Sequence, residues 1–210
     1  MSTKDIRETS LVDLESFLLE IKEPKFRAKQ IWQWLWEKKA RDFDSMQNIP
    51  KKLRDQLKQA FTFRITQIDQ AQYSKDGTIK VIFKLWDDNR VEGVLIPTKK
   101  RTTACISSQV GCSLSCTFCA TGYLPRTRNL KAFEIFDQVV LINQLSEEHC
   151  QKSLDNIVYM GMGEPLLNYK EVIQSVNYIT SPTGLGMSPS RITVSTAGIT
   201  KMIKKLADDG

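Results

Sequence analysis

The chain has 210 residues, of which 41% are hydrophobic and 26% are charged, and its formal net charge is +6. This length supports one large core with a smaller appendage, and the composition excludes disordered and fibrous proteins. No stretch approaches the roughly 18 consecutive apolar residues of a membrane span, and residues 1–10 lack the apolar centre of a signal peptide. We therefore expect a soluble, cytoplasmic protein of one or two domains.

The first sixty residues predict a small helical domain. Ser10 followed by Asp13 is typical of a capping box, and spaced leucines predict a helix over residues 11–21 that stops near Pro24. A second helix is expected over residues 25–38, and a third begins at Pro50. The second helix carries many aromatic residues, which core packing explains, with a docking surface for RNA or for the main domain as the alternative.

Residues 61–100 predict an antiparallel β extension. The spacing of apolar residues changes to two from Phe61, with Phe63 and Ile65 alternating with polar residues. Strands are expected over residues 78–86 and 91–96, bounded by polar turns at 75–77 and 87–89.

Residues 101–210 predict an α/β domain of three βα units. Strands are expected over residues 103–107, 156–160 and 191–195, followed by helices over residues 133–145, 169–180 and 198–207. Parallel strands of such units present ligand sites at their carboxyl ends. The loops after the three strands are therefore expected to face the same rim.

The loop after the first of these strands holds Cys112, Cys116 and Cys119 in a C-x3-C-x2-C pattern. Three thiolates on one loop can hold three corners of a 4Fe-4S cluster and leave the fourth iron open to a substrate. A zinc site with His149 as fourth ligand is the alternative, but structural zinc sites usually use C-x2-C pairs and no second pair exists here. Five cysteines in a cytoplasmic chain argue against a disulfide framework.

A cluster with an open iron beside a glycine-rich loop is typical of radical S-adenosylmethionine enzymes, which this chain resembles. Further motifs are Arg90-Val91-Glu92, residues 105–112, Arg128-Asn129-Leu130, residues 160–168 and Val194-Ser195-Thr196. Through these motifs the chain resembles the dual-specificity RNA methyltransferases that methylate C2 of adenine in ribosomal and transfer RNA, and residues 24–36 resemble the accessory domain of that family. The resemblance implies a helical accessory domain followed by the first half of a TIM-like radical SAM barrel.

The resemblance also assigns roles to residues. Gly163, Glu164 and Ser195 are expected to bind S-adenosyl-L-methionine beside the cluster, while Glu92 is the proton acceptor and Cys105 resolves an enzyme–RNA adduct. In the family, one S-adenosylmethionine methylates a cysteine near the C-terminus, and a second is reductively cleaved at the cluster to a radical that activates that methyl group. Radical chemistry suits C2 of adenine because the two flanking nitrogens make it a poor nucleophile. A disulfide bond is also implied, without an assigned pairing.

The expected partners are large-subunit (23S) ribosomal RNA, transfer RNA and a reductant such as flavodoxin or ferredoxin. The protein is expected to be a monomer that does not bind a membrane. Residues 93–133 contain no acidic residue, so we expect the cations there to contact phosphates, with a merely solvated face as the alternative. These cations are Lys99, Lys100, Arg101, Arg126, Arg128 and Lys131. The target adenine must be flipped out of its stack.

The sequence differs from the family in length. It ends at Gly210 after three βα units, whereas the family's barrel has six. The remaining half of the family's barrel holds a Ser-Leu-His motif, a cofactor-contacting asparagine and the methyl-carrying cysteine. The chain is therefore either a fragment or altered in function, and by itself it is expected not to methylate RNA. The alternatives are an adenine-C8 methyltransferase of the antibiotic-resistance type and a non-catalytic RNA-binding or metal-binding module.

Overall fold

The computed structural model describes residues 3–209 and divides the chain into two compact units. The first unit comprises the residues up to Ile65 together with Tyr178–Gly186, and the second comprises Thr66–Asn177 together with the residues from Met187 on. Within the described residues, no helix combines the length and the apolar character needed to cross a bilayer.

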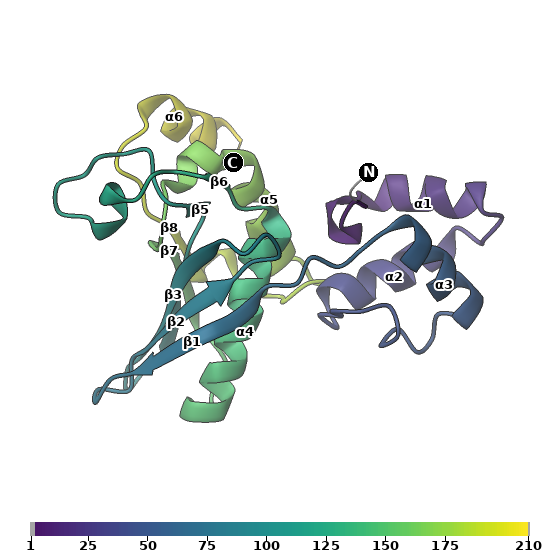
Figure 1. Cartoon of the computed structure of the whole chain (residues 1–210), viewed down its shortest axis with the longest axis horizontal. Coiled ribbons are helices and arrows are strands. Elements are labelled where there is room, and N and C mark those ends of the chain that lie inside the picture. Colours follow the sequence, from purple (N-terminus) through teal and green to yellow (C-terminus); the bar gives the residue numbers. More distant parts are fainter. Residues whose placement is uncertain (1–2, 210) are drawn as a thin grey trace. The chain divides into compact units, whose positions relative to one another are not determined.

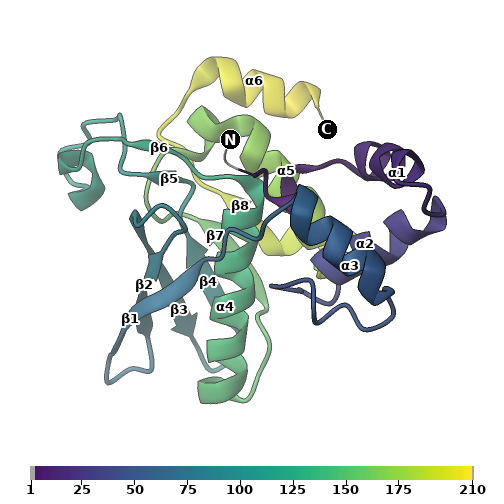
Figure 2. The ribbon, with the colours of Figure 1, turned by 45° about the vertical axis from the view of Figure 1, so that its right-hand side comes forward.

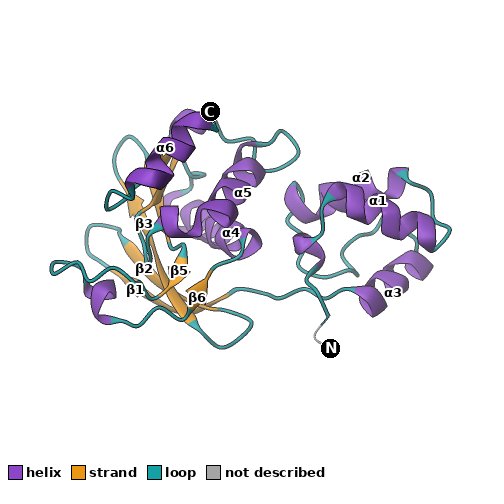
Figure 3. Ribbon diagram, turned by 90° about the horizontal axis from the view of Figure 1, so that it is seen from above, coloured by secondary structure: helices purple, strands orange, loops and turns teal. Residues whose placement is uncertain are grey.

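The first unit is helical, as the sequence predicted. Its helices are α1 (Leu11–Glu20), α2 (Phe26–Trp36) and α3 (Lys51–Ala60), preceded by the short 3-10 helix η1 (Ile6–Glu8) (Figure 3). The predicted N-cap is confirmed, because the Ser10 hydroxyl accepts from the Asp13 amide at 3.1 Å. The Asp13 carboxylate accepts from the Ser10 hydroxyl at 2.7 Å, whereas in a full capping box it would accept from the Ser10 amide. Leu14, Leu18 and Ile31 are fully buried between the helices.

The expected start of the β extension at Phe61 is wrong, because the first strand, β1, begins at Gln67. The ring of Phe61 instead lies edge-on to Phe17 at 5.0 Å between ring centroids, and that of Phe63 lies edge-on to Phe43 at 4.7 Å. The alternating aromatic residues are therefore two anchors of the helical core. Periodicity alone does not distinguish such an extended tether from a strand.

The second unit is built on one six-stranded sheet in the order β1-β2-β3-β4-β7-β8 (Figure 1). Its strands are β1 (Gln67–Tyr73), β2 (Ile79–Lys84), β3 (Arg90–Pro97), β4 (Thr102–Ile106), β7 (Asn156–Tyr159) and β8 (Ile192–Val194). The first four strands pair antiparallel, and β4, β7 and β8 pair in parallel. The α/β prediction is thus confirmed, and the expected β extension continues directly into the parallel sheet.

Helices follow each parallel strand, as α4 (Ala132–Cys150), α5 (Tyr169–Thr180) and α6 (Thr200–Asp208). Helix α4 packs against β3 and β4. Gly93 permits this close packing, because a Cβ atom there would lie 3.1 Å from Ile142 on α4 and 2.6 Å from Phe83. Since side chains alternate along a strand, Val91 and Leu95 face the helix with Gly93, and Glu92 points to the opposite face.

The face opposite α4 is only partly covered. Cys105 on β4 pairs with Val94 on β3 and with Val158 on β7, and all three side chains are half-buried. Glu92 lies two residues before Val94 and is also half-buried on this face. The sheet therefore has one closely packed face and one accessible face.

A second, two-stranded ladder of β5 (Gln109–Val110) and β6 (Arg128–Asn129) brackets the cysteine loop. The loop leaves from β5, forms the 3-10 helix η2 (Ala120–Tyr123) and returns through β6 (Figure 2). Two further 3-10 helices are η3 (Pro165–Asn168) and η4 (Pro189–Arg191). The sequence did not predict the ladder, because two-residue strands carry no periodicity.

Candidate active site at the carboxyl rim of the parallel strands

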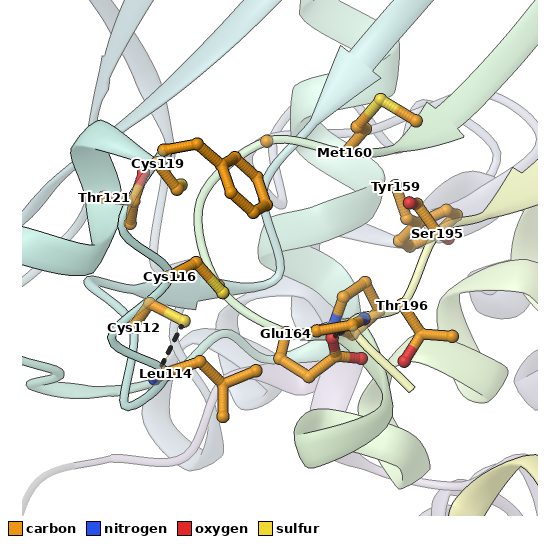
Figure 4. A pocket seen from close by; sticks show the side chains of 15 residues that line it. Cys112, Leu114, Cys116, Cys119, Thr121, Tyr159, Met160, Glu164, Ser195 and Thr196 are labelled. Carbon is orange, nitrogen blue, oxygen red and sulfur yellow. Dashed lines mark hydrogen bonds between the residues drawn. The ribbon is translucent and has the colours of Figure 1, made fainter. Parts of the chain in front are cut away.

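Three loops meet at the carboxyl ends of β4, β7 and β8. They line one cavity of about 200 Å³, drawn in Figure 4. The cavity is lined by six residues that the sequence singled out, namely Cys112, Cys116, Cys119, Gly163, Glu164 and Ser195. Residues 83 positions apart in the chain thus share one site, because parallel strands place their carboxyl ends at the same edge of a sheet.

The cysteine loop supplies three half-buried thiols to this cavity. Cys112 Sγ accepts a hydrogen bond from the Leu114 amide at 3.4 Å, and the Cys119 amide donates to the Cys116 carbonyl at 3.0 Å. Gly111 has a φ of +72°, and a Cβ atom there would collide with the Pro125 backbone. Glycine therefore lets the two ends of the loop touch.

The donor set fits an iron–sulfur cluster, whose irons prefer thiolate ligands. In residues 3–209, however, no group of three or more His, Cys, Asp or Glu side chains converges closely enough to hold a metal ion. The thiols share a loop and a cavity, but they are not a ready-made ligand cage. The expected disulfide bond is not supported, since all five cysteines are free and no two lie at bonding distance.

The glycine loop after β7 packs directly on the segment that leads into the cysteine loop. A Cβ atom at Gly161 would lie 2.7 Å from the Ile106 carbonyl, and Gly163, with a φ of +90°, lies against the Gln109 side chain. A side chain at either position would push the two segments apart. The glycines therefore allow contact between loops, in addition to the cofactor binding that the resemblance implies for Gly163.

Glu164 is buried and connects the second loop to the third. Its Oε1 accepts from the Leu166 amide at 2.9 Å, and its Oε2 accepts from the Ala197 amide at 2.7 Å. The Ser195 amide donates to the Tyr159 carbonyl at 3.3 Å, which holds the start of the third loop beside β7. A carboxylate oxygen has two lone pairs, so each Glu164 oxygen can still accept from a ligand.

Cys105 and Glu92 lie outside this cavity, on the accessible face of the sheet. Burial raises the pKa of the Cys105 thiol, against the smaller opposing effect of a hydrogen bond with the Met160 backbone. The thiol is therefore protonated near neutral pH. Glu92 forms an ion pair with Lys80 at 2.7 Å and lines a second cavity of about 360 Å³, which shares Thr121 with the first.

The basic window is continuous in sequence but divided in space. Lys99, Lys100 and Arg101 precede β4, so they lie at the opposite end of that strand from the cysteine loop. Arg128 lies near the loop but forms ion pairs with two carboxylates. Its Nε lies 2.6 Å from the Asp87 carboxylate, and its Nη1 lies 2.7 Å from the Glu134 carboxylate. Burial alone would lower the pKa of Arg128, but these two carboxylates raise it above its ordinary value. It is a structural cation.

Sequence reasoning missed the buried polar residues beneath the rim. Ser107, Ser108, Gln109 and Asn168 are at most 3% exposed and hydrogen-bond to the backbone of the site loops. A usable signal was present, because three consecutive polar residues follow an apolar strand directly. Buried polar groups of this kind are normally hydrogen-bonded, so they mark backbone that must be held in place.

Comparison with known proteins agrees with the resemblance inferred from the sequence. Residues 4–63 match the family described as the ribosomal RNA large subunit methyltransferase N-terminal domain. A probable dual-specificity RNA methyltransferase RlmN of Christiangramia forsetii aligns with 98% of the chain at 55% sequence identity. The dual-specificity RNA methyltransferase RlmN of Solidesulfovibrio magneticus aligns with 96% of the chain at 42% identity. The recognised resemblance is therefore confirmed.

A solved structure shows the same fold. The crystal structure of a radical SAM methyltransferase from Sphaerobacter thermophilus matches 97% of this chain with a TM-score of 0.85 and 38% identity. The chain spans 58% of the Christiangramia relative, 59% of the Solidesulfovibrio relative and 60% of the solved structure. The predicted partial radical SAM fold is thus confirmed.

Proposed function

We propose that this chain is the cluster-binding and cofactor-binding part of a radical S-adenosylmethionine RNA methyltransferase. The observation that carries the proposal is the single cavity in which three cysteine thiols, a glycine loop and a third strand-end loop meet. The similarity over 98% of the chain to dual-specificity RNA methyltransferases supports the same function.

Each side of the cavity has its own task in this proposal. Cys112, Cys116 and Cys119 hold a 4Fe-4S cluster, and Gly163, Glu164 and Ser195 bind S-adenosyl-L-methionine. The cluster, when bound, supplies the electron that cleaves the sulfonium of the cofactor. Glu164 accepts hydrogen bonds from the cofactor while its backbone contacts keep the second and third loops together.

The proposed substrate is C2 of adenine in ribosomal and transfer RNA, with Glu92 as proton acceptor and Cys105 as the thiol that resolves the adduct. Their positions are compatible with shared work on one substrate. Cys105 pairs with Val94 across the sheet, and the Ser107 hydroxyl donates to the Glu92 carbonyl at 2.6 Å. The two side chains are therefore diagonal neighbours on one face, which places them roughly 7–8 Å apart. The enzyme is proposed to act in the cytoplasm as a monomer with a flavodoxin-like or ferredoxin-like reductant.

Anaerobic reconstitution with iron and sulfide, followed by S-adenosylmethionine and dithionite, tests the proposal. We expect release of 5'-deoxyadenosine, detected by liquid chromatography, and no release from the Cys116→Ala variant. A folded chain that holds four irons but neither binds nor cleaves the cofactor would refute the proposal. A chain that binds zinc instead of a cluster would support the metal-binding module.

A further inference from the structure

One buried side chain joins the cysteine loop to the glycine loop. Gln109 is fully buried, and its Oε1 accepts from the Glu164 amide at 2.9 Å. On its other side, Nε2 donates to Asn129 Oδ1 at 2.7 Å. Both ends of the amide are therefore used, and each end reaches a different loop.

The bond to Asn129 closes the base of the cysteine loop. Gln109 and Asn129 are directly opposite each other in the β5–β6 ladder, where the loop begins and ends. The side-chain bond adds to the backbone pairing of this very short ladder. Gln109 is therefore attached to the base of the loop that carries the three thiols.

The bond to Glu164 fixes the glycine loop against the same point. The amides of Ser108 and Gln109 both donate to the Met162 carbonyl, at 2.9 and 3.2 Å, and Gly163 touches the Gln109 side chain. Glu164 continues the connection through its carboxylate to the Ala197 amide. One hydrogen-bonded series, Asn129–Gln109–Glu164–Ala197, thus crosses all three loops of the site.

We propose that Gln109 is a positioning residue that sets the spacing between the cluster loop and the cofactor-binding backbone at Gly163 and Glu164. This inference rests on the proposed function, in which one cofactor touches both loops at once. A ligand held from two sides requires a fixed distance between them, and a side chain that bonds to both loops supplies it before the ligand arrives.

The test uses Gln109→Met, which keeps the size and the buried position but removes both hydrogen bonds. We expect unchanged iron content after reconstitution and an affinity for S-adenosylmethionine about 10–100-fold weaker, as for other residues that orient a ligand-binding group. The electron paramagnetic resonance signal of the reduced cluster should also change less when the cofactor is added. These readouts do not depend on turnover.

Asn143→Leu is the matched control. Asn143 makes the same two kinds of bond, accepting from the Leu154 amide at 2.9 Å and donating to Glu147 at 2.8 Å, but it lies in α4 away from the site. We expect this variant to lose stability without losing cofactor affinity. Gln109→Glu, which keeps an acceptor for the Glu164 amide, should retain more affinity than Gln109→Met and serves as the test if Gln109→Met does not fold.

Several outcomes would overturn the inference. Wild-type affinity in Gln109→Met, equal losses in Gln109→Met and Asn143→Leu, or loss of iron together with the cofactor would each show that Gln109 has no positioning role. If Gln109→Met does not fold, Gln109→Glu decides: retained affinity supports the role, and affinity as low as background overturns it. Failure of the wild-type chain to bind the cofactor would instead refute the proposed function.

Discussion

The helical unit and the α/β unit both bury polar side chains, but these side chains hold different things. In the helical unit, Arg7 pairs with Asp5 at 3.0 Å, and the Arg64 amide donates to the same carboxylate at 2.6 Å. Asp5 is fully buried and Arg7 is 4% exposed. This network joins the beginning of the unit to the segment through which the chain leaves it.

In the α/β unit, the buried polar residues gather under the loops of the site. Ser107 accepts from the Met162 amide, Gln109 from the Glu164 amide, and Asn168 donates to two backbone carbonyls. These bonds contribute little to the core itself, but they fix where the loops lie. The buried polar network of the helical unit therefore joins the two ends of that unit, whereas that of the α/β unit fixes the loops of the candidate site.

The largest expected effect is loss of the proposed cluster when one of its proposed cysteine ligands is replaced. Cys116→Ala should abolish the brown visible absorption after anaerobic reconstitution, because the two thiols that remain cannot hold the cluster. Cys150→Ala, which removes a thiol at the end of α4, is the control and should keep the absorption. A Cys116→Ala chain with four irons would show that the cavity is not the cluster site.

Arg128→Met should produce the largest loss of stability. Glu134 is fully buried and takes two hydrogen bonds from Arg128 and one from the Lys131 amide. The variant keeps the amide bond but removes the cation from a buried carboxylate, at a cost of about 3–5 kcal/mol. Urea unfolding followed by circular dichroism measures it. Lys131→Met removes a half-exposed 3.6 Å pair with Glu171 and should cost below about 1 kcal/mol. Equal effects of the two variants would contradict the structural role of Arg128.

Arg7→Met sharpens the comparison between the two networks. It removes charged hydrogen bonds to Asp5, although backbone amides still reach that carboxylate, so we expect a loss of about 2–3 kcal/mol. The affinity of Arg7→Met for S-adenosylmethionine should stay at the wild-type value. Gln109→Met should instead lose cofactor affinity and lose less stability than Arg7→Met. Thermal unfolding and equilibrium cofactor binding, measured on the same samples, separate these outcomes. Weaker cofactor binding in Arg7→Met would break the distinction.

The thiol of Cys105 gives a smaller, pH-dependent effect. Its pKa is raised in the folded chain, so the folded chain holds this proton more tightly than the unfolded chain. The stability it contributes is full below the unfolded pKa of about 8.5 and falls as the pH rises through the folded pKa. Alkylation of Cys105 by iodoacetamide should therefore reach half its maximal rate at a higher pH in buffer than in urea. Mass spectrometry of the labelled peptide measures this midpoint.

The smallest expected effect concerns RNA binding. Four phosphate contacts would give a slope of log K against log salt near −3, at about 0.7 per contact for single-stranded RNA. Arg126 is exposed on the cysteine loop, so Arg126→Ala should reduce the slope by about 0.7, whereas Arg128→Met should not change it. Filter binding over a salt series tests both. An equal change in the two variants would mean that Arg128 also reaches phosphate.

The sequence by itself determined the features that depend on neighbours in the chain. Helix α5 covers the predicted residues 169–180, and the cysteine spacing specified one loop with three thiols. The three strand-end loops were predicted to share a rim because parallel strands with crossover helices leave no other arrangement.

Only the tertiary structure decided which distant groups meet. The pairing of β3 with β4, the use of Phe61 and Phe63 as anchors of the helical core, the capture of Arg128 by Asp87 and Glu134, and the joint at Gln109 were not predicted. Gln109 and Glu164 are 55 residues apart, and Arg128 and Asp87 are 41 residues apart. Local spacing reports turns, caps and periodicity, whereas a contact between distant residues exists only when the packed core brings their backbones together.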